Sequence, residues 1–207
     1  MANLTERIRF FYRHYIYKKW YDKFIMLSYV KKREEIRKYG QNFSIDNFVE
    51  TGTFMGDTVE FLKNDFKNIW SIELEPNLAA KAKERFKDAN HIKILEGDSS
   101  EVLKSIVPID GPTLFWLDGH YSSSFSINDQ KINTAKGSKE TPILEELSII
   151  LEEGLNQNVI LIDDARCFNG TNDYPTVAQL KKHLENLIDG NFRLSIKNDI
   201  IRIVNGS

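Results

Sequence analysis

A glycine-containing turn between an apolar segment and a helical pattern is the feature that most constrains how this chain folds. Residues 48–58 run from apolar side chains through Glu50 to Gly52 and Gly56, and a helical pattern follows. Two close glycines after a strand let the backbone approach a ligand, and the next helix offers unpaired amides at its N-terminus. The segment therefore predicts a site for a nucleotide-like cofactor.

A carboxylate follows at the distance that such a site needs. Residues 69–73 form a second strand pattern that ends in Glu73, 21 residues after Gly52. An acid at this place can accept hydrogen bonds from both hydroxyls of a ribose. The residues themselves thus support Glu73 most strongly as a cofactor ligand.

The glycine spacing does not match the dinucleotide fingerprint. That fingerprint needs small residues two and five positions after the first glycine, where this chain has Phe54 and Asp57. Asp57 at the start of the helix would also repel a pyrophosphate. The residues favour S-adenosylmethionine, which has no phosphates, over NAD.

Three segments carry a resemblance to a known family. The chain has E-x-G-x-x-x-G at residues 50–56, S-I-E-L-E-P at residues 71–76 and E-G-D-S at residues 96–99. These segments resemble the first three motifs of the class I S-adenosylmethionine-dependent methyltransferases, and the resemblance covers roughly residues 45–205. Asp98 also suits an ordinary turn and helix N-cap. The resemblance implies these cofactor-binding residues: Glu50, Thr51, Gly52, Thr53, Gly56 and Thr58 around the methionine moiety, Glu73 on the ribose, Asp98 and Ser99 beside the adenine, and Asp118.

Strand and helix patterns alternate after residue 45, which indicates an α/β fold with a parallel sheet between helices. Residues 192–197 and 200–204 predict a closing hairpin. The resemblance implies a Rossmann-like, doubly wound sheet of seven strands, mostly parallel, with an antiparallel last strand. The expected strands before the hairpin are 46–51, 68–73, 91–95, 112–117 and 158–163, and the expected helices are 57–66, 77–87, 99–106 and 142–153.

Composition and charge indicate one globular domain and a distinct N-terminal segment. The 207 residues, 41% hydrophobic and 28% charged, suit one core of ordinary size, which we assign to residues 45–207. We predict a basic, aromatic-rich helical arm over residues 1–44, because residues 1–40 carry 11 Lys and Arg against 4 Asp and Glu, a net charge of +7. The arm is predicted to pack on the domain, to form a lid over the site, or to bind a membrane surface or an acidic partner.

The remaining residues have a net charge of −9, since the whole chain has −2. This argues against a nucleic-acid-binding site, because phosphate contacts need clustered cations. The single Cys167 excludes an intramolecular disulfide, no signal-peptide pattern is visible, and we expect a cytoplasmic protein. The longest uncharged stretch of the N-terminal region, residues 24–30, has seven residues, so we expect no transmembrane segment. The sequence leaves a homodimer open.

Acidic residues follow two further apolar strand patterns. Asp118 comes directly after one, and Asp163 and Asp164 come after the other. Parallel strands would place these carboxylates at one edge of the sheet, where they repel one another unless a cation or a proton intervenes. Oxygen ligands select Mg²⁺, Mn²⁺ or Ca²⁺ over zinc, and we favour Mg²⁺. Alternatively, Asp163 or Asp164 caps the next segment and Asp118 orients the cofactor or the acceptor.

The three acids resemble the metal ligands of the metal-dependent O-methyltransferases, both the catechol type and the group that methylates sugars. The sugar-methylating group carries Asp-Asp at the second place, as Asp163 and Asp164 do. The catalytic lysine of the catechol pattern is replaced by Tyr121. His120 is therefore the leading candidate for the base, beside Asp118 as a second catalytic residue, because an imidazole titrates near neutrality; a structural histidine is the alternative.

Two features near the acids complete the predicted site. Residues 121–141 form a polar segment too long for an ordinary connection, and we predict a substrate loop rather than a simple linker. Arg166 would meet an anionic substrate group or form a surface salt bridge, which we favour. His14, His91 and His183 are predicted to be structural or exposed.

Together these patterns predict an S-adenosylmethionine-dependent O-methyltransferase, assisted by a divalent metal, with a small-molecule or glycan acceptor that is polyhydroxylated, such as a sugar. A metal-independent methyltransferase with His120 as the sole base is the nearest alternative. A non-catalytic binding or scaffold protein with the same fold is the alternative from another class, and it would use the basic arm to hold a partner.

Overall fold

The computed structural model divides into two units, residues 1–35 and 36–207. Helical backbone runs over residues 29–42, so the last part of the predicted arm, from residue 36 on, belongs to the larger unit. No described helix combines the length and the apolar character needed to cross a membrane. The structure describes residues 29–119, 125–127, 130–132, 141–152 and 154–206, and the remainder of the predicted arm lies outside them.

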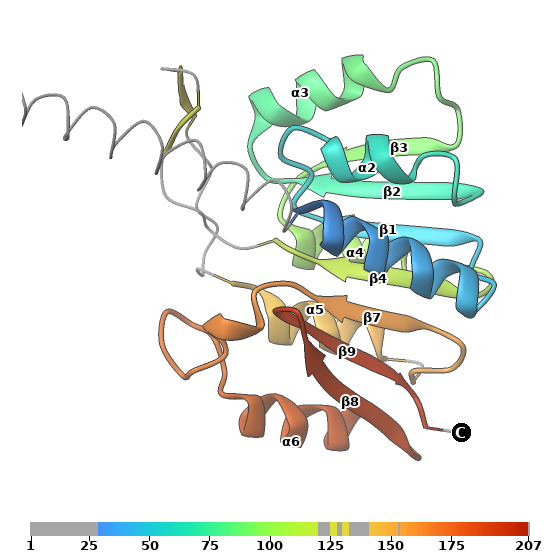
Figure 1. The fold of residues 1–207 in the computed structure, drawn as a ribbon, viewed down its shortest axis with the longest axis vertical. Helices are drawn as coiled ribbons and strands as arrows, with labels where there is room; N and C mark the ends of the chain where they lie inside the picture. The colour runs from blue at the N-terminus through green and yellow to red at the C-terminus, as the bar shows by residue number, and fades with distance from the viewer. Residues whose placement is uncertain (1–28, 120–124, 128–129, 133–140, 153, 207) are drawn as a thin grey trace, which may run out of the picture. The chain divides into compact units, whose positions relative to one another are not determined.

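The larger unit contains a seven-stranded sheet with the strand order β3-β2-β1-β4-β7-β9-β8 (Figure 1). Strands β1 to β4 and β7 are parallel to one another, and β9 is antiparallel to both β7 and β8. This confirms the predicted Rossmann-like sheet, its antiparallel last strand and its closing hairpin. The strands are β1 Asn47–Thr51, β2 Asn68–Glu73, β3 Ile92–Glu96, β4 Thr113–Leu117, β7 Val159–Ile162, β8 Phe192–Lys197 and β9 Ile200–Asn205.

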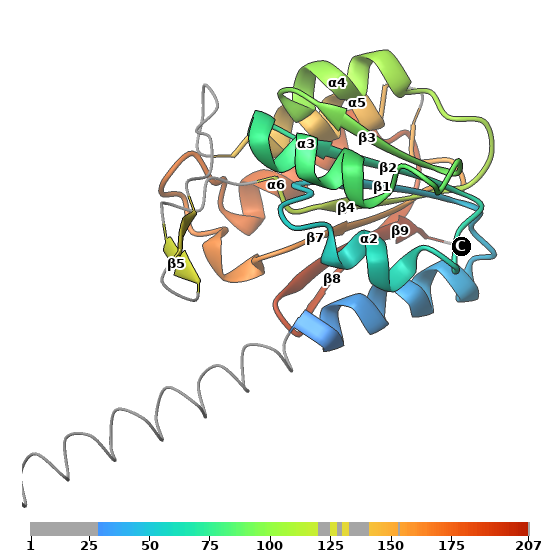
Figure 2. The same ribbon diagram turned by 90° about the horizontal axis from the view of Figure 1, so that it is seen from above.

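Helices cover both faces of the sheet, as the alternation of strand side chains requires. In β1, for example, Phe48 packs with α2, α3 and Ile36 on one face, whereas Val49 packs with α4, α5 and α6 on the other. Figure 2 shows α4 and α5 on the side of the sheet opposite to α2. The helices are α2 Asp57–Leu62, α3 Pro76–Arg85, α4 Ser99–Ile106, α5 Ile143–Ile150 and α6 Val177–Leu187.

The structure adds a helix, α6, and a pair of short strands, β5 and β6, that the sequence analysis did not predict. Helix α6 begins with a reciprocal capping box, in which Thr176 accepts from the amide of Gln179 and the Gln179 side chain accepts from the amide of Thr176. The segment predicted as a loop over residues 121–141 contains a short antiparallel pair, β5 Phe125–Ile127 and β6 Gln130–Ile132. The rest of that segment, up to residue 140, lies outside the described residues.

Candidate active site

The turn after β1 is held close to the neighbouring strands. The amides of Gly52 and Thr53 donate to the carbonyl of Ile72 at 2.9 and 3.1 Å. Gly52 has φ +90°, and a Cβ there would lie 2.6 Å from the carbonyl oxygen of Asp118. A glycine is therefore required, because the turn crosses directly against the backbone that follows β4.

Glu73 is fixed at the end of β2 by two backbone amides. Its Oε2 accepts from the amide of Phe54 at 2.7 Å and its Oε1 accepts from the amide of Glu75 at 2.9 Å. Burial raises the pKa of Glu73, while the two amide hydrogen bonds act in the opposite direction. Each carboxylate oxygen has a further lone pair, so the group can still accept from a pair of hydroxyls.

Glu50 lies beneath the turn in a buried chain of hydrogen bonds. The hydroxyl of Ser71 donates to Glu50 Oε2 at 2.6 Å, and the hydroxyl of Thr53 lies 2.6 Å from that of Ser71. Glu50 is only 2% exposed. The arrangement ties the end of β1 to β2, and a contact of Glu50 with the cofactor stays a prediction.

Asp98 caps helix α4 beside Glu73. Its Oδ1 accepts from the amide of Ser100 at 3.0 Å and from its hydroxyl at 2.6 Å, which confirms the N-cap alternative. The amide of Gly97 donates to the carbonyl of Glu73 at 2.9 Å, so the ends of β2 and β3 are joined at this point. The predicted adenine contacts of Asp98 and of the buried Ser99 remain predictions.

The negative charge of Asp57 at the start of α2 is paired with Arg85. Arg85 donates to Asp57 Oδ1 at 2.8 Å and to the carbonyl of Met55 at 2.6 Å. Gly56, the N-cap of α2, has φ +75°, and a Cβ there would meet the ring of Phe86 at 2.8 Å. Because Arg85 neutralises Asp57, the repulsion of a pyrophosphate by Asp57 is weaker than the sequence suggested.

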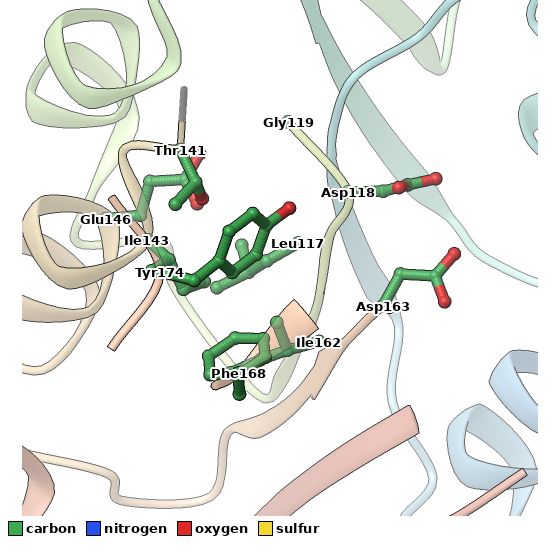
Figure 3. Close-up of a pocket in the computed structure, with 10 residues that line it drawn as sticks. All are labelled: Leu117, Asp118, Gly119, Thr141, Ile143, Glu146, Ile162, Asp163, Phe168 and Tyr174. Atoms are coloured by element: carbon green, nitrogen blue, oxygen red, sulfur yellow. The ribbon is translucent and has the colours of Figure 1, made fainter. Parts of the chain in front are cut away.

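Asp118 and Asp163 leave the sheet in the same direction. The amide of Asp118 donates to the carbonyl of Thr51 at 3.1 Å, and that of Asp163 donates to the carbonyl of Leu117 at 3.0 Å, so both continue the strand pairing. Residues in the same register of paired strands share a face. Figure 3 shows both carboxylates directed to one side, away from Glu146.

Two of the three predicted metal ligands lie together with a further acid. Asp163 and Asp164 offer oxygens within 4.8 Å of one another and of Asp199, a group that does not include Asp118. Arg166 pairs with Asp164 at 2.7 Å and also with Asp199. The salt-bridge interpretation of Arg166 is thus confirmed, and Asp199, between the two strands of the predicted hairpin, is an acid that the sequence analysis did not consider as a ligand.

Glu146, in the first turn of α5, is a candidate that the sequence analysis missed. It is 1% exposed, and its Oε1 has no hydrogen-bond partner in the part of the chain that the structure describes. Burial raises the pKa of Glu146 to about 7, although hydrogen bonds from Ser99 and Thr51 lower it. A signal was present, because Glu146 occupies a buried helix position between the apolar Ile143 and Leu147.

A pocket opens between the ends of β4 and β7. It has about 220 Å³, counted with the open space at its mouth, and its lining includes aromatic rings and polar side chains. The rings of Phe168 and Tyr174 meet edge to face at 5.3 Å. Burial raises the pKa of Tyr174, so its phenol keeps its proton at neutral pH. The polar residues of the lining are Asp118, Thr141, Glu146, Asp163 and Tyr174.

The structure describes two of the four histidines. His91 Nε2 lies 2.8 Å from the carbonyl of Lys63, and His183 Nε2 lies 3.1 Å from the hydroxyl of Ser148, so both are structural as predicted. His120, the predicted base, and His14 lie outside the described residues.

The strand order and the glycine turn together define the fold of the class I S-adenosylmethionine-dependent methyltransferases. No protein-family model and no curated protein sequence matches the chain. Solved structures of methyltransferases do match it. Because their sequence identities are low, the likeness establishes the fold alone.

Three of these structures illustrate the likeness. PaMTH1 from Podospora anserina, bound to S-adenosylhomocysteine (SAH), has 16% identity and a TM-score of 0.57, over 85% of this chain and 78% of its own. The O-methyltransferase TomG from Streptomyces achromogenes, in complex with S-adenosylmethionine, has 16% identity and a TM-score of 0.57, over 85% and 80%. An O-methyltransferase from Bacillus cereus, in complex with SAH, has 13% identity and a TM-score of 0.54, over 84% and 81%.

Proposed function

We propose that this protein is an S-adenosylmethionine-dependent O-methyltransferase, assisted by a divalent cation, that acts on a small polyhydroxylated acceptor such as a sugar or a glycan-linked group. The observation that carries the proposal is the placement of Glu73. Its carboxylate stands at the carboxyl edge of a methyltransferase-type sheet, fixed by the amides of Phe54 and Glu75.

The cofactor part of the proposal rests on the ends of β1, β2 and β3. Bound S-adenosylmethionine supplies a methyl group on a sulfonium. Glu73 would accept from its ribose hydroxyls, since both carboxylate oxygens are already oriented by the backbone. The turn at Gly52 would bring the backbone close to the methionine moiety. These residues therefore act by binding and orienting, which is most of what methyl transfer requires.

The acceptor part rests on the pocket between β4 and β7. Polar side chains can hydrogen-bond to hydroxyls, and the lining of the pocket includes those of Thr141, Glu146 and Tyr174, whereas the carboxylates of Asp118 and Asp163 point away from Glu146. Its volume of about 220 Å³ includes the open space at its mouth, and the enclosed part has room for only about one water molecule. The pocket would thus take one polar group of an acceptor, such as a hydroxyl, with the rest of the acceptor outside it.

The cation part rests on the kind of ligand atoms that the acids offer. Asp118 and Asp163 provide only oxygen atoms and point to one side, which suits a hard cation such as Mg²⁺. The predicted ligands Asp118, Asp163 and Asp164 would hold the cation, and Asp199, which lies in one group with Asp163 and Asp164, would be a further ligand. Arg166 pairs with Asp164 at the same place. A bound cation would lower the pKa of the acceptor hydroxyl. The predicted role of His120 as the base stays part of this proposal.

The proposed location is the cytoplasm. Cys167 is the single cysteine of the chain, and a chain that cannot form an intramolecular disulfide suits a reducing compartment. Expression of the tagged chain followed by cell fractionation tests this location, and recovery of the protein from an oxidising compartment would contradict it.

Calorimetric titration of the full chain with SAH tests the proposed cofactor. We expect micromolar binding of SAH and none of NAD, which serves as the control. Absence of SAH binding would overturn the proposal. A positive result is followed by an acceptor screen with sugars and catechols, with Mg²⁺ or with EDTA, in which turnover that survives EDTA would remove the cation from the proposal.

A further inference from the structure

Glu146 is a buried carboxyl group without a complete set of partners. An isolated charge or polar atom inside a protein is costly, and unsatisfied buried groups are rare enough that each needs a reason. Glu146 is 1% exposed and its Oε1 has no hydrogen-bond partner in the described part of the chain. Such a group is what a ligand with a hydrogen-bond donor would complete.

The surroundings of Glu146 belong to the proposed cofactor site. Hydrogen bonds from Thr51, at the end of β1, and from Ser99, in the first turn of α4, reach its carboxyl group, and the charge of Asp98, the N-cap of that helix, also acts on it. The backbone after β4 passes on the remaining side, where a Cβ added to Gly119 would lie 3.3 Å from Oε1. Gly119 therefore places no side chain against Oε1.

Glu146 also stands apart from the proposed cation ligands. Figure 3 shows it beside Thr141, while the carboxylates of Asp118 and Asp163 point the other way. Because strand residues alternate between faces, Thr51 lies on the face that α5 covers, opposite to that of Glu50. Glu146 is thus placed to contact the cofactor from the α4 and α5 side of the sheet.

We propose that Glu146 is a cofactor-binding residue whose carboxyl group accepts a hydrogen bond from an amino group of S-adenosylmethionine. This inference rests on the proposed function. Among the donors of the cofactor, the ribose hydroxyls have Glu73, whereas the amino groups of the adenine and of the methionine moiety each have hydrogens enough for an acceptor besides the predicted Asp98 and Glu50. Both amino groups donate hydrogen bonds, the adenine one as a neutral amine and the methionine one as an ammonium, and the two are separable by experiment.

The test compares SAH binding by calorimetry in the full chain and in two variants. Glu146→Leu removes the acceptor, and we expect affinity for SAH to fall about tenfold or more, as loss of one hydrogen bond to a charged group implies. Glu146→Gln keeps one carbonyl oxygen, and we expect a fall of about threefold, because neutral acceptors bind more weakly. Glu152→Gln is the matched control, since Glu152 is an exposed acid just after the same helix.

Titration with 5′-methylthioadenosine distinguishes the two amino groups. This probe keeps the adenine amino group and lacks that of the methionine moiety. Weakened binding of both SAH and the probe in Glu146→Leu assigns the adenine amino group, and weakened binding of SAH alone assigns the other. Thermal unfolding shows which variants fold, and either folded variant that binds SAH as the wild type does would overturn the inference. If the wild type itself does not bind SAH, the proposed function fails instead.

Discussion

The carboxyl edge of the sheet has two halves that hold their acids in different ways. In the cofactor half, formed by the ends of β1, β2 and β3, backbone amides hold the carboxylates of Glu73 and Asp98. In the acceptor half, formed by the ends of β4 and β7, the amide of Asp164 holds Asp163, but Asp164 itself pairs with the guanidinium of Arg166. Glu146, in the first turn of α5, has an oxygen without a hydrogen-bond partner among the described residues.

This difference indicates which half of the site is already ordered before a ligand binds. A backbone amide is positioned as soon as its turn and strand have formed, whereas a side-chain partner such as the guanidinium of Arg166 must first be fixed in one of several rotamers. The cofactor half is therefore expected to be rigid in the free protein. The acceptor half is expected to depend on its ligands and on tertiary packing.

Replacement of Gly52 by alanine would break the cofactor half at its tightest point. The left-handed backbone costs alanine about 1 to 2 kcal/mol, and the clash with the Asp118 carbonyl at 2.6 Å adds about 1 to 3 kcal/mol. We expect urea unfolding to show a total loss of about 2 to 5 kcal/mol. Gly154→Ala is the control, because Gly154 has φ +83° with no atom within 4 Å of a new Cβ. Equal losses in both variants would show that the close approach does not matter.

The pH dependence of stability sharpens the contrast at Glu146. With its pKa raised to about 7, folded Glu146 keeps a proton between pH 4.5 and 7 that the unfolded chain releases. Unfolding free energy therefore falls as pH rises through this window, by at most about 3 kcal/mol, and the contribution is fully present only below the unfolded pKa. Urea unfolding at pH 5 and pH 8 should show a smaller pH dependence in Glu146→Gln. Parallel pH profiles in the two proteins would contradict the raised pKa.

Removal of Glu73 tests whether the preorganised carboxylate is used for binding. We expect Glu73→Ala to weaken SAH by about 1 to 3 kcal/mol, because hydrogen bonds to the ribose are lost. Glu75→Ala is the matched control: Glu75 caps α3 by accepting from the amide of Leu78, so its loss should cost about 1 kcal/mol of stability without weakening SAH. Calorimetry measures both affinities, and an unchanged affinity in Glu73→Ala would remove this residue from the site.

Titration with Mn²⁺ probes the acceptor half directly and carries the smallest expected effect. We expect Asp163→Asn to weaken Mn²⁺ binding about tenfold, or about 1.4 kcal/mol, while SAH affinity stays at the wild-type value. Asp88→Asn, at an exposed position elsewhere, is the control. Electron paramagnetic resonance of free Mn²⁺ measures the binding, and wild-type binding by Asp163→Asn would count against the proposed cation ligands.

The sequence predicted the cofactor half well for the same reason that this half is preorganised. Gly52, Glu73 and Asp98 lie in or next to short turns, where the local pattern of glycine, acid and strand determines the geometry. All strands of the large sheet were predicted, the parallel ones mainly from their apolar runs and the antiparallel β8 and β9 from the hairpin pattern. The local signals and the final structure agree there.

The acceptor half was predicted less completely because its geometry depends on distant partners. Asp199 lies near Asp163 and Asp164 because the hairpin of β8 and β9 pairs with β7. No local sequence pattern predicts that these three acids lie close together. Two omissions did have signals. The capping box of Thr176 and Gln179 marks the start of α6, and Glu146 is a charge in an apolar helix register.

The insertion of β9 between β7 and β8 bears on the synthesis of the protein. Strand β8 leaves the ribosome before β9, yet among the described strands it pairs only with β9. A nascent chain that ends near residue 197 therefore leaves one edge of β7 unpaired, next to a β8 segment with no neighbour. Such edges attract other chains. We expect this stage of translation to be when the protein depends most on chaperones, until residues 200–205 emerge and close the sheet.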